Sequence, residues 1–213
     1  MNGTTAPSYM GATETGKERW ALLLAGGDGS RLRSLTRELA GDDRPKQFCR
    51  VMGGETLLEQ TLRRALLTVP RARVMVAVTE WHERFYKTLL PATGIPQIVS
   101  QPQNRGTAPG ILYPLLRLAE LAPDAALAIF PSDHHFSDDR RFAAHVDGAF
   151  RAAEADPARV FLLGIIPDTH ESEYGWIEPV ARLGIGGERA AQSVRQFWEK
   201  PDAGFAETPP WAR

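Results

Sequence analysis

The sequence predicts an α/β fold built on a mainly parallel, mixed sheet. Two patterns support this prediction. Short apolar runs of strand length alternate with longer segments whose apolar residues recur at helical spacing. Polar or glycine-rich segments directly follow several of these runs, as at the carboxyl ends of parallel strands. Strands that alternate with crossover helices form a sheet covered on both faces, so we expect a Rossmann-like three-layer sandwich.

The predicted strands are short and apolar, and turn-forming or polar residues separate them from the helices. The strands cover residues 20–25, 73–79, 97–99, 126–130 and 160–165. The helices cover residues 56–67, 81–89, 107–121 and 140–155. Thr56 and Glu59 form a capping-box pattern at the start of the first helix. Pro114 is expected to kink the third helix, because proline has no N–H group to donate.

Composition and charge limit the classes of protein to which the chain can belong. Its 213 residues, 43% of them hydrophobic, can bury a substantial core. A net charge of -1, from 25 basic and 26 acidic residues, argues against a nucleic-acid partner. Cys49 is the only cysteine, which excludes an internal disulfide and a thiolate metal cage. No segment has the pattern of a signal peptide or membrane span, so we expect a cytoplasmic protein with no membrane partner.

The first 19 residues are polar and without periodicity, so we expect residues 1–19 to be a disordered tail. Within this tail, residues 11–18 match a nucleotide-binding P-loop except at the last position, where Glu18 replaces the hydroxyl that holds magnesium. No predicted strand precedes the segment, and the Glu18 carboxylate would repel phosphate. We therefore reject it as a nucleotide site.

A glycine-rich turn after the first predicted strand is a strong candidate for an anion site. Glycine permits a tight turn whose N–H groups converge on an anion, and a helix behind the turn adds the positive end of its dipole. The guanidinium of Arg31, which follows, is a fork of donors suited to phosphate oxygens. The alternative is an ordinary turn between a strand and a helix. The turn consists of Leu24, Ala25, Gly26, Gly27, Asp28, Gly29 and Ser30.

Two further segments could contact the same ligand. Arg44 and Lys46 flank a proline, which fixes the local backbone and could hold Lys46 at a defined distance from a phosphate. Gln101 follows the third predicted strand, and its amide both donates and accepts, as the edge of a purine base requires. In that segment, Gly106 allows close approach to a ring or ribose, and Thr107 is a candidate helix N-cap. The alternatives are a charged surface turn and a polar loop.

Asp133 follows the fourth predicted strand and is a candidate ligand for Mg²⁺, which prefers hard oxygen donors. The adjacent His134 and His135 would point to opposite faces if they lay on one strand, so they would not clamp one metal ion. Without a cysteine cluster or a helical His-x-x-x-His pattern, zinc is not expected. Packed or surface imidazoles are the alternative for both histidines.

The segments at residues 174–179 and 197–201 each combine aromatic residues with a carboxylate near a proline. Carboxylates that accept paired hydroxyl hydrogen bonds, beside aromatic rings, suit a sugar. Lys200, next to Glu199, could hold a sugar phosphate. The alternative for each segment is a strand end with an exposed charge.

Together, these six segments resemble the sugar nucleotidyltransferase family, and most closely its mannose-1-phosphate guanylyltransferases. They occur in the family's order between residues 24 and 201. Pro-Lys-Gln-Phe at residues 45–48 and Pro-Ser-Asp-His at residues 131–134 indicate the guanylyl branch. The resemblance implies the nucleotide-diphospho-sugar transferase fold, Mg²⁺ as cofactor, and GTP and mannose 1-phosphate as substrates.

The resemblance also implies roles for matching positions. The expected catalytic residues are Arg31, Lys46 and Asp133, and Asp133 would also hold the metal ion. The expected nucleotide-binding residues are Leu24, Ala25, Gly26, Gly27, Gly29, Ser30, Arg31, Gln101, Gly106 and Thr107. The expected sugar-phosphate-binding residues are Gly175, Glu199 and Lys200.

The chain departs from the family pattern at three places. Arg33 and Ser34 stand where members usually carry Trp-Pro, and Gly106 stands where they carry Asn. Members also continue past Glu-Lys-Pro into a helix and a strand that carry an Asn-Ser-Gly motif and a second metal-binding aspartate. We therefore expect residues 20–213 to form a catalytic domain that is incomplete at its C-terminal end.

The predicted reaction is attack by a sugar-phosphate oxygen on the α-phosphorus of GTP. The alternatives are another nucleotide or sugar specificity, a binding module without turnover, and a metal phosphoesterase. The last is rejected because the chain has no Asp-x-Asp pair to accompany Asp133, His134 and His135. A homodimer is a candidate assembly.

Overall fold

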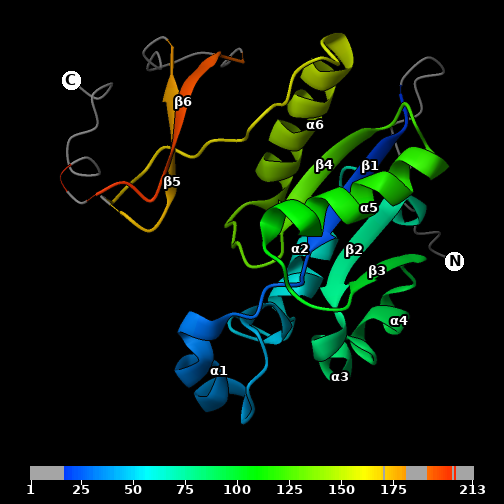
Figure 1. Ribbon diagram of the computed structural model, residues 1–213, viewed down its shortest axis with the longest axis vertical. Helices are drawn as coiled ribbons and strands as arrows, with labels where there is room; N and C mark the ends of the chain where they lie inside the picture. Colours follow the sequence, from blue (N-terminus) through cyan, green and yellow to red (C-terminus); the bar gives the residue numbers. More distant parts are fainter. Residues whose placement is uncertain (1–16, 170, 181–190, 203, 205–213) are drawn as a thin grey trace, which may run out of the picture. The chain divides into compact units, whose positions relative to one another are not determined.

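The computed structural model describes residues 17–169, 171–180, 191–202 and 204 (Figure 1). The chain forms two compact units, Met1–Pro157 and Ala158–Arg213, which are described separately. Most of the predicted tail at residues 1–19 lies outside the described residues. Within the described ranges, no helix has the length and apolar character of a membrane span.

The first unit contains a four-stranded parallel sheet in the order β3-β2-β1-β4, and this confirms the predicted α/β class. Each strand lies within two residues of a predicted one. The strands are β1 (Arg19–Leu24), β2 (Val74–Thr79), β3 (Gln97–Gln101) and β4 (Ala126–Pro131).

The helices of this unit also follow the prediction in most places. Thr56 and Glu59 form the predicted capping box, with a 2.7 Å bond from the Thr56 N–H to the Glu59 carboxylate. α5 runs through Pro114 as a single helix. The helices are α1 (Arg33–Ala40), α2 (Leu57–Ala65), α3 (Glu83–Tyr86), α4 (Leu89–Thr93), α5 (Thr107–Leu121) and α6 (Asp139–Ala155).

Two predicted elements need correction, and one helix was not predicted. The helix predicted at residues 81–89 is divided between a 3₁₀ turn, α3 and the start of α4. Pro91 explains the break, because it cannot donate to the carbonyl of Lys87 and its ring crowds that carbonyl. Residues 160–165 form no strand, and Val160 and Ile165 are 88% and 76% exposed. A strand needs a neighbour for its hydrogen bonds, and no described strand pairs with this segment. α1 was not predicted.

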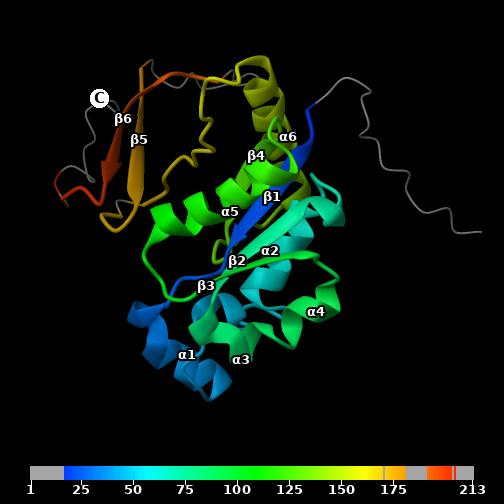
Figure 2. The same cartoon turned by 45° about the vertical axis from the view of Figure 1, so that its right-hand side comes forward.

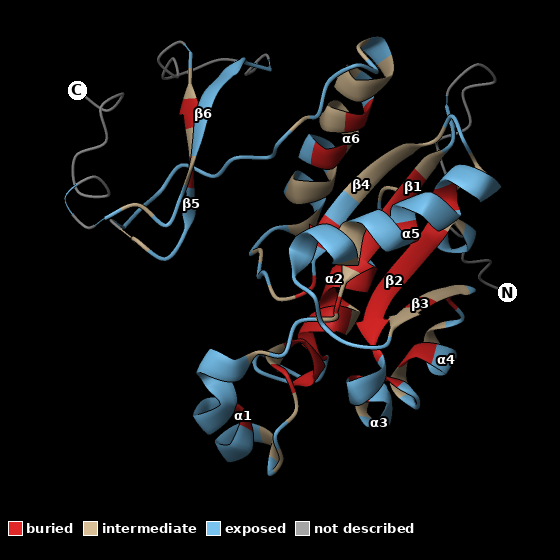
Figure 3. Ribbon diagram, viewed as in Figure 1, coloured by how far each residue is buried: buried red, intermediate tan, exposed pale blue. Residues whose placement is uncertain are grey.

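Alternating side chains of β1 pack against helices on the two faces of the sheet. Ala21 and Leu23 join a cluster that includes residues of α2 and α6. Trp20 and Leu22 join a second cluster with Leu118 of α5. Figures 1 and 2 show α5 on one face and α2 on the other, and Figure 3 shows that β1 and β2 are the most buried strands. Both faces are therefore covered, as a three-layer sandwich requires.

The strand order reverses between β1 and β4. β2 and β3 extend the sheet on one side of β1, whereas the chain returns through α5 to place β4 on the other side. Leu24 is paired with Pro131, so the two strands end side by side. In open α/β sheets, ligands bind beyond the strand ends where the order reverses in this way.

The second unit contains one antiparallel pair, β5 (Gly175–Pro179) and β6 (Val194–Glu199). Trp176 and Glu178 of β5 are buried within it. The indole N–H of Trp198 donates to the Glu178 carboxylate at 3.1 Å. These bonds give the pair a defined register.

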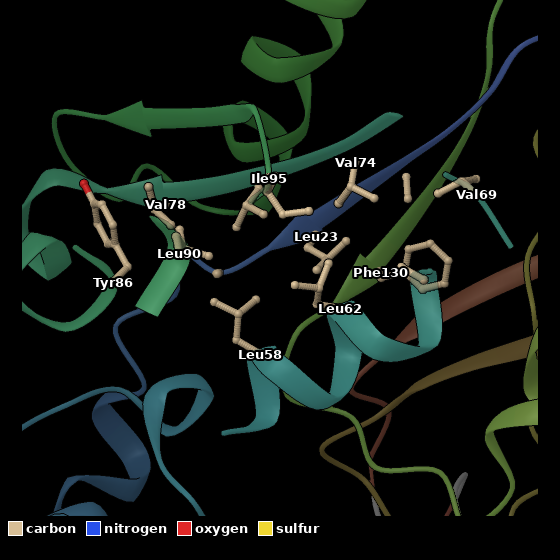
Figure 4. Close-up of a cluster of buried hydrophobic side chains, with 14 of the residues drawn as sticks. Leu23, Leu58, Leu62, Val69, Val74, Val78, Tyr86, Leu90, Ile95 and Phe130 are labelled. Atoms are coloured by element: carbon tan, nitrogen blue, oxygen red, sulfur yellow. The ribbon is translucent and has the colours of Figure 1, made fainter. Parts of the chain in front are cut away.

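Leu23 is expected to be a major contributor to stability. Its side chain is fully buried in the cluster shown in Figure 4, where Leu58 and Leu62 of α2 lie close to it. Leu23→Ala should lower the free energy of unfolding by about 2–5 kcal/mol, because it removes buried methyl groups and leaves a cavity. Urea denaturation measures this change. Leu116→Ala is the control, because Leu116 is 58% exposed and its loss should cost less than about 0.5 kcal/mol.

Candidate functional site

Residues 25–30, here called the glycine loop, connect β1 to a 3₁₀ turn at Ser30–Leu32, and α1 follows directly. Only Gly29 of the three loop glycines has a positive φ, of 59°. A Cβ atom at Gly29 would lie 3.4 Å from the backbone N of Lys46, tighter than most real contacts. The positive φ therefore favours glycine at this position, and the Lys46 backbone leaves little room for a side chain.

The Gln47 side chain holds the glycine loop at two points. Gln47 is 4% exposed and follows Lys46 in a 3₁₀ turn, Lys46–Phe48. Its Nε2 donates to the carbonyl of Ala25 at 2.9 Å and to the carbonyl of Gly27 at 2.7 Å. A side-chain amide has two N–H donors, so both bonds form at once.

Two hydroxyl groups, at the ends of the two strands that flank β1, hold the carbonyls of Gly26 and Leu24. The Thr79 hydroxyl, at the end of β2, donates to the carbonyl of Gly26 at 2.9 Å. The Ser132 hydroxyl, just after β4, donates to the carbonyl of Leu24 at 2.5 Å. Four successive carbonyls, from Leu24 to Gly27, therefore accept hydrogen bonds from the body of the unit.

This anchoring determines the direction of the loop N–H groups. In a trans peptide, the N–H of one residue points opposite to the carbonyl of the residue before it. The described chain has no cis peptide, so the N–H groups of Gly26, Gly27 and Asp28 point away from the donors that hold the carbonyls. Gly27 and Asp28 are exposed. N–H groups arranged in this way can bind an anion, as predicted for this turn.

Lys46 and Asp133 meet at the carboxyl end of the sheet. The Lys46 Nζ lies 2.7 Å from Asp133 Oδ2, and both side chains are about one-third exposed, at 32% and 31%. Pro45, before Lys46, is buried, and Phe48, after it, stacks on Phe85 of α3. The structure thus brings together two residues that the sequence places far apart and predicts to share a site.

Arg64 supports the segment that carries Asp133. Its side chain extends from α2 and is only 2% exposed. One guanidinium nitrogen donates to the carbonyl of His134 at 2.7 Å and to the Thr61 hydroxyl at 2.8 Å. The guanidinium also lies over the ring of Phe136, 5.2 Å from the ring centre, within the range of a cation–π contact. Burial lowers the pKa of Arg64, yet an arginine remains charged at neutral pH.

The predicted base-binding segment lies at the end of β3. The Gln101 amide donates to the carbonyl of Pro109 at 2.9 Å, which fixes the segment to the start of α5. Gly106, with φ of 90°, is the N-cap residue of α5, so the predicted N-cap at Thr107 is wrong by one residue. The left-handed backbone needed before the helix favours glycine over threonine. A shallow pocket is lined by Gln101, Pro102, Gln103, Arg105, Pro109 and Tyr113.

The described residues contain no group of three or more His, Cys, Asp or Glu that could hold a metal ion. His134 and His135 follow β4, which ends at Pro131, so the strand geometry considered for them does not apply. Asp133 is a partly exposed carboxylate and suits Mg²⁺, which commonly takes one or two carboxylates and completes its ligands with substrate phosphates and water. Arg31 lies in the 3₁₀ turn directly after the glycine loop.

The predicted sugar-phosphate residues lie together at one end of the β5–β6 pair. Gly175 and Glu199 are cross-strand partners, and the N–H of Lys200 donates to the carbonyl of Tyr174 at 3.2 Å. A Cβ atom at Gly175 would lie 2.2 Å from the Phe197 ring. Packing against Phe197 therefore accounts for Gly175 without a ligand.

Sequence reasoning missed four residues that position this site: Gln47, Arg64, Thr79 and Ser132. Gln47 and Ser132 belong to recognised segments, but no sequence signal indicates which carbonyl an uncharged side chain will bind. A basic residue within the apolar pattern of α2 is the one visible sign of Arg64.

The model of the nucleotidyl transferase family matches residues 20–208. The xanthan biosynthesis protein XanB of Xanthomonas campestris pv. campestris is 34% identical over 188 residues, which cover 87% of this chain and 38% of XanB. The mannose-1-phosphate guanylyltransferase of Escherichia coli K12 is 32% identical over 192 residues, which cover 88% of this chain and 39% of that protein. The chain thus spans less than half the length of these relatives.

Among solved structures, a mannose-1-phosphate geranyltransferase from Thermus thermophilus is 31% identical and superposes with a TM-score of 0.76. That match covers 89% of this chain and 52% of the other. A mannose-6-phosphate isomerase from Helicobacter pylori, 20% identical with a TM-score of 0.63, shows the same fold.

Gln47→Met should disturb the glycine loop, because the methionine side chain cannot donate to the carbonyls of Ala25 and Gly27. We expect the free energy of unfolding to fall by about 1–3 kcal/mol. We also expect the amide resonances of residues 26–29 to shift in ¹H–¹⁵N spectra. Gln60→Met is a matched control, because Gln60 is 6% exposed and its amide also holds two loop carbonyls, those of Met52 and Glu55. Gln60→Met should lower the free energy of unfolding by a similar amount but leave the amide resonances of residues 26–29 unchanged. Equal shifts of these resonances in both variants would contradict the role of Gln47 in holding the glycine loop.

Proposed function

Because the chain belongs to the nucleotidyl transferase family, we propose that it joins a nucleoside triphosphate to a sugar 1-phosphate. The proposed substrates are GTP and mannose 1-phosphate, and the products are GDP-mannose and pyrophosphate. The names of the mannose-1-phosphate guanylyltransferase relatives support this choice. Residues 20–213 are proposed to act as the catalytic domain.

The contact between Lys46 and Asp133 is the main structural support. The pair joins a cation and a hard oxygen ligand 2.7 Å apart at the end of a parallel sheet. The Gln47 amide, one residue beyond Lys46, holds the glycine loop, so the loop and the pair belong to one arrangement. A phosphate-binding loop, a lysine and a carboxylate are the parts that recur in sites for phosphoryl transfer.

The proposed chemistry needs no general base. The nucleophile is an oxygen of the sugar phosphate, which is already anionic at neutral pH. It forms a bond to the α-phosphorus of GTP, and the bond from that phosphorus to the bridging oxygen breaks, so that pyrophosphate leaves with the electron pair. The difficulty is the repulsion between two anions, which oriented cations and N–H donors reduce.

We assign these tasks to the predicted residues. The glycine loop and Arg31 bind the triphosphate, and Lys46 neutralises charge at the reacting phosphates. Residues Gln101, Gly106 and Thr107 lie beside the base and ribose. Gly175, Glu199 and Lys200 bind the sugar 1-phosphate in the second unit.

The donor set also fits Mg²⁺ as cofactor. Asp133 would supply a carboxylate ligand, with phosphate oxygens and water completing the coordination. When bound, the ion neutralises phosphate charge and orients the triphosphate.

The direct test is pyrophosphate release from GTP and mannose 1-phosphate in the presence of Mg²⁺. Replacing GTP by ATP, or mannose 1-phosphate by glucose 1-phosphate, tests another specificity of the same reaction. Binding of both substrates without pyrophosphate release would instead support a binding module. Sedimentation of the active preparation distinguishes a monomer from the candidate homodimer.

Lys46→Ala should slow turnover about ten- to a hundredfold, because a hydrogen bond to a charged group contributes roughly 1.5–3 kcal/mol. Steady-state kinetics measures the change. Lys87→Ala is the control, because the Lys87 side chain is 72% exposed and pairs with Glu83 on α3. Near-normal turnover of Lys46→Ala would remove Lys46 from the reaction.

Asp133→Asn should raise the Mg²⁺ concentration needed for half-maximal turnover by roughly tenfold, because a neutral amide is a weaker ligand than a carboxylate. Titration of activity with Mg²⁺ measures this shift. Asp124→Asn, at an exposed position, should leave it unchanged. Lys46→Ala distinguishes the metal role from the ion pair, because it breaks the pair but keeps the carboxylate. An equal shift in Lys46→Ala and Asp133→Asn would contradict the assignment.

A further inference from the structure

His82 contacts the glycine loop at Asp28 and has no role in the proposed reaction. It belongs to a 3₁₀ turn, Glu80–His82, just after β2, and it is 7% exposed. Its Nδ1 is 3.0 Å from the Thr79 hydroxyl oxygen, and its Nε2 is 3.4 Å from Asp28 Oδ1. The two ring nitrogens therefore face two different residues that contact or belong to the loop.

On the Thr79 side, the number of protons limits what the ring can do. The carbonyl of Gly26 accepts a hydrogen bond from the Thr79 hydroxyl at 2.9 Å. A hydroxyl has a single proton, so while that bond is made, the Thr79 oxygen can only accept from His82. The Nδ1 of His82 must then carry a proton.

On the Asp28 side, the same reasoning applies. An ionised carboxylate only accepts hydrogen bonds, so Nε2 attracts Asp28 only when it also carries a proton. The other Asp28 oxygen accepts from the Asn104 amide at 2.9 Å, and the Asn104 side-chain oxygen accepts from the Gly106 N–H at 2.9 Å. Asp28 thus connects the glycine loop to the segment before α5.

A neutral imidazole has only one N–H and cannot satisfy both contacts. With the proton on Nδ1, the Nε2 lone pair faces the Asp28 carboxylate, and that contact becomes repulsive. With the proton on Nε2, the Thr79 hydroxyl turns to Nδ1, and the carbonyl of Gly26 loses its donor. Only the doubly protonated ring keeps the two hydrogen bonds of the Thr79 hydroxyl oxygen together with the ion pair to Asp28.

We propose that His82 is a positioning residue for the glycine loop, which it holds through Thr79 and Asp28 together only when its imidazole carries two protons. The loop is then held at Gly26 through the Thr79 hydroxyl and at Asp28 through the His82 ring, in addition to the Asn104 bond to Asp28. After loss of one proton, one of the two contacts that depend on His82 is lost, while the Asn104 bond remains.

The charges around His82 set the pH range of this change. Burial is the largest effect and lowers the pKa of His82 below its usual value; Asp28 opposes this shift, whereas Arg33 of α1 and Arg84 of α3 add to it. The ring of Phe48 packs edge-on against His82 and adds no charge. The lowered pKa means that His82 should take up its second proton at a more acidic pH than an ordinary histidine.

The protonation of His82 should also be coupled to nucleotide binding. This step rests on the proposed function, in which the glycine loop binds a triphosphate. A polyanion beside the loop favours the charged imidazole, so nucleotide binding should be accompanied by proton uptake at His82. The linkage is reciprocal, so the affinity for nucleotide should be higher when His82 is protonated and should fall as the pH rises.

The first experiment uses the ligand-free protein. The five histidines are labelled with ¹⁵N, and their ring nitrogens are followed through a pH titration together with the backbone amides. The Gly27 N–H shares a peptide plane with the carbonyl of Gly26, so its resonance reports directly on the Thr79 bond. We expect it to shift with the same midpoint as the His82 ring. A Gly27 resonance that does not move while His82 titrates would overturn the proposal.

Two variants test the Thr79 contact and the Asp28 contact of the His82 ring separately. Thr79→Val removes the hydroxyl with little change of shape, so His82 should still titrate while the Gly27 resonance no longer follows it. Asp28→Asn removes the negative charge and offers an N–H to Nε2, so the neutral ring is satisfied and the change at Gly27 should become smaller. His145→Gln, at an exposed position of α6, is the control and should leave the titration of Gly27 unchanged. Unchanged coupling in both Thr79→Val and Asp28→Asn would also overturn the proposal.

The second experiment measures GTP binding calorimetrically with Mg²⁺ at about pH 5 and about pH 8, which bracket ordinary histidine titration. The affinity of the wild-type protein should change at least about fivefold more than that of Asp28→Asn. GTP's own phosphate protonation is common to both proteins and cancels in this comparison. GTP binding with the same pH dependence in both would refute the link. If GTP does not bind to the wild type, the proposed function fails, while the NMR titration still decides the role of His82.

Discussion

The geometry of the trans peptide is the constraint on which this site depends. Side chains from two separate segments hold the carbonyls of Ala25, Gly26 and Gly27, and the N–H groups on the opposite side of those peptides, from Gly26 to Asp28, must then point away from these donors. The carbonyl of Leu24 is held by Ser132 in the same way, while the N–H of Ala25 donates to Ala77 of β2. The donors come from the ends of two strands and from the turn that carries Lys46. Parallel strands place such ends at one edge of the sheet, so the fold brings together these hydrogen-bond donors from residues that are distant in the sequence.

Internal contacts occupy charged groups of the site before any ligand binds. Lys46 is paired with Asp133, and the Asp28 carboxylate lies within the glycine loop between His82 and Asn104. With a net charge of -1, the chain has no broad field to attract anions, so local groups must do so. A bound polyanion therefore has to compete with these internal contacts. This competition explains why metal dependence, lysine substitution and histidine protonation should each change the behaviour of the site.

The sequence predicts most of the architecture because the pattern of apolar residues follows the geometry of strands and helices. Four strands and α5 are close to their predicted bounds, and the capping box at Thr56 is present. The strand predicted at residues 160–165 is absent, because a strand depends on a partner that local sequence does not specify. Asp133 is expected at the carboxyl end of the sheet because it follows a predicted strand, and the family resemblance implies that Lys46 shares its site. The bonds made by Gln47 and Thr79 depend on distances that no local pattern encodes.

Lys200, a residue of the proposed sugar-phosphate site, has an unusual backbone conformation. It is the only described residue other than glycine with a positive φ, of 48°. This conformation costs a non-glycine residue roughly 1–2 kcal/mol, so surrounding contacts must maintain it. The bond from the Lys200 N–H to the carbonyl of Tyr174 does so, and it places Lys200 directly after the pair of Gly175 and Glu199. Backbone strain is concentrated at functional sites, and here it occurs at the one lysine expected to bind a sugar phosphate.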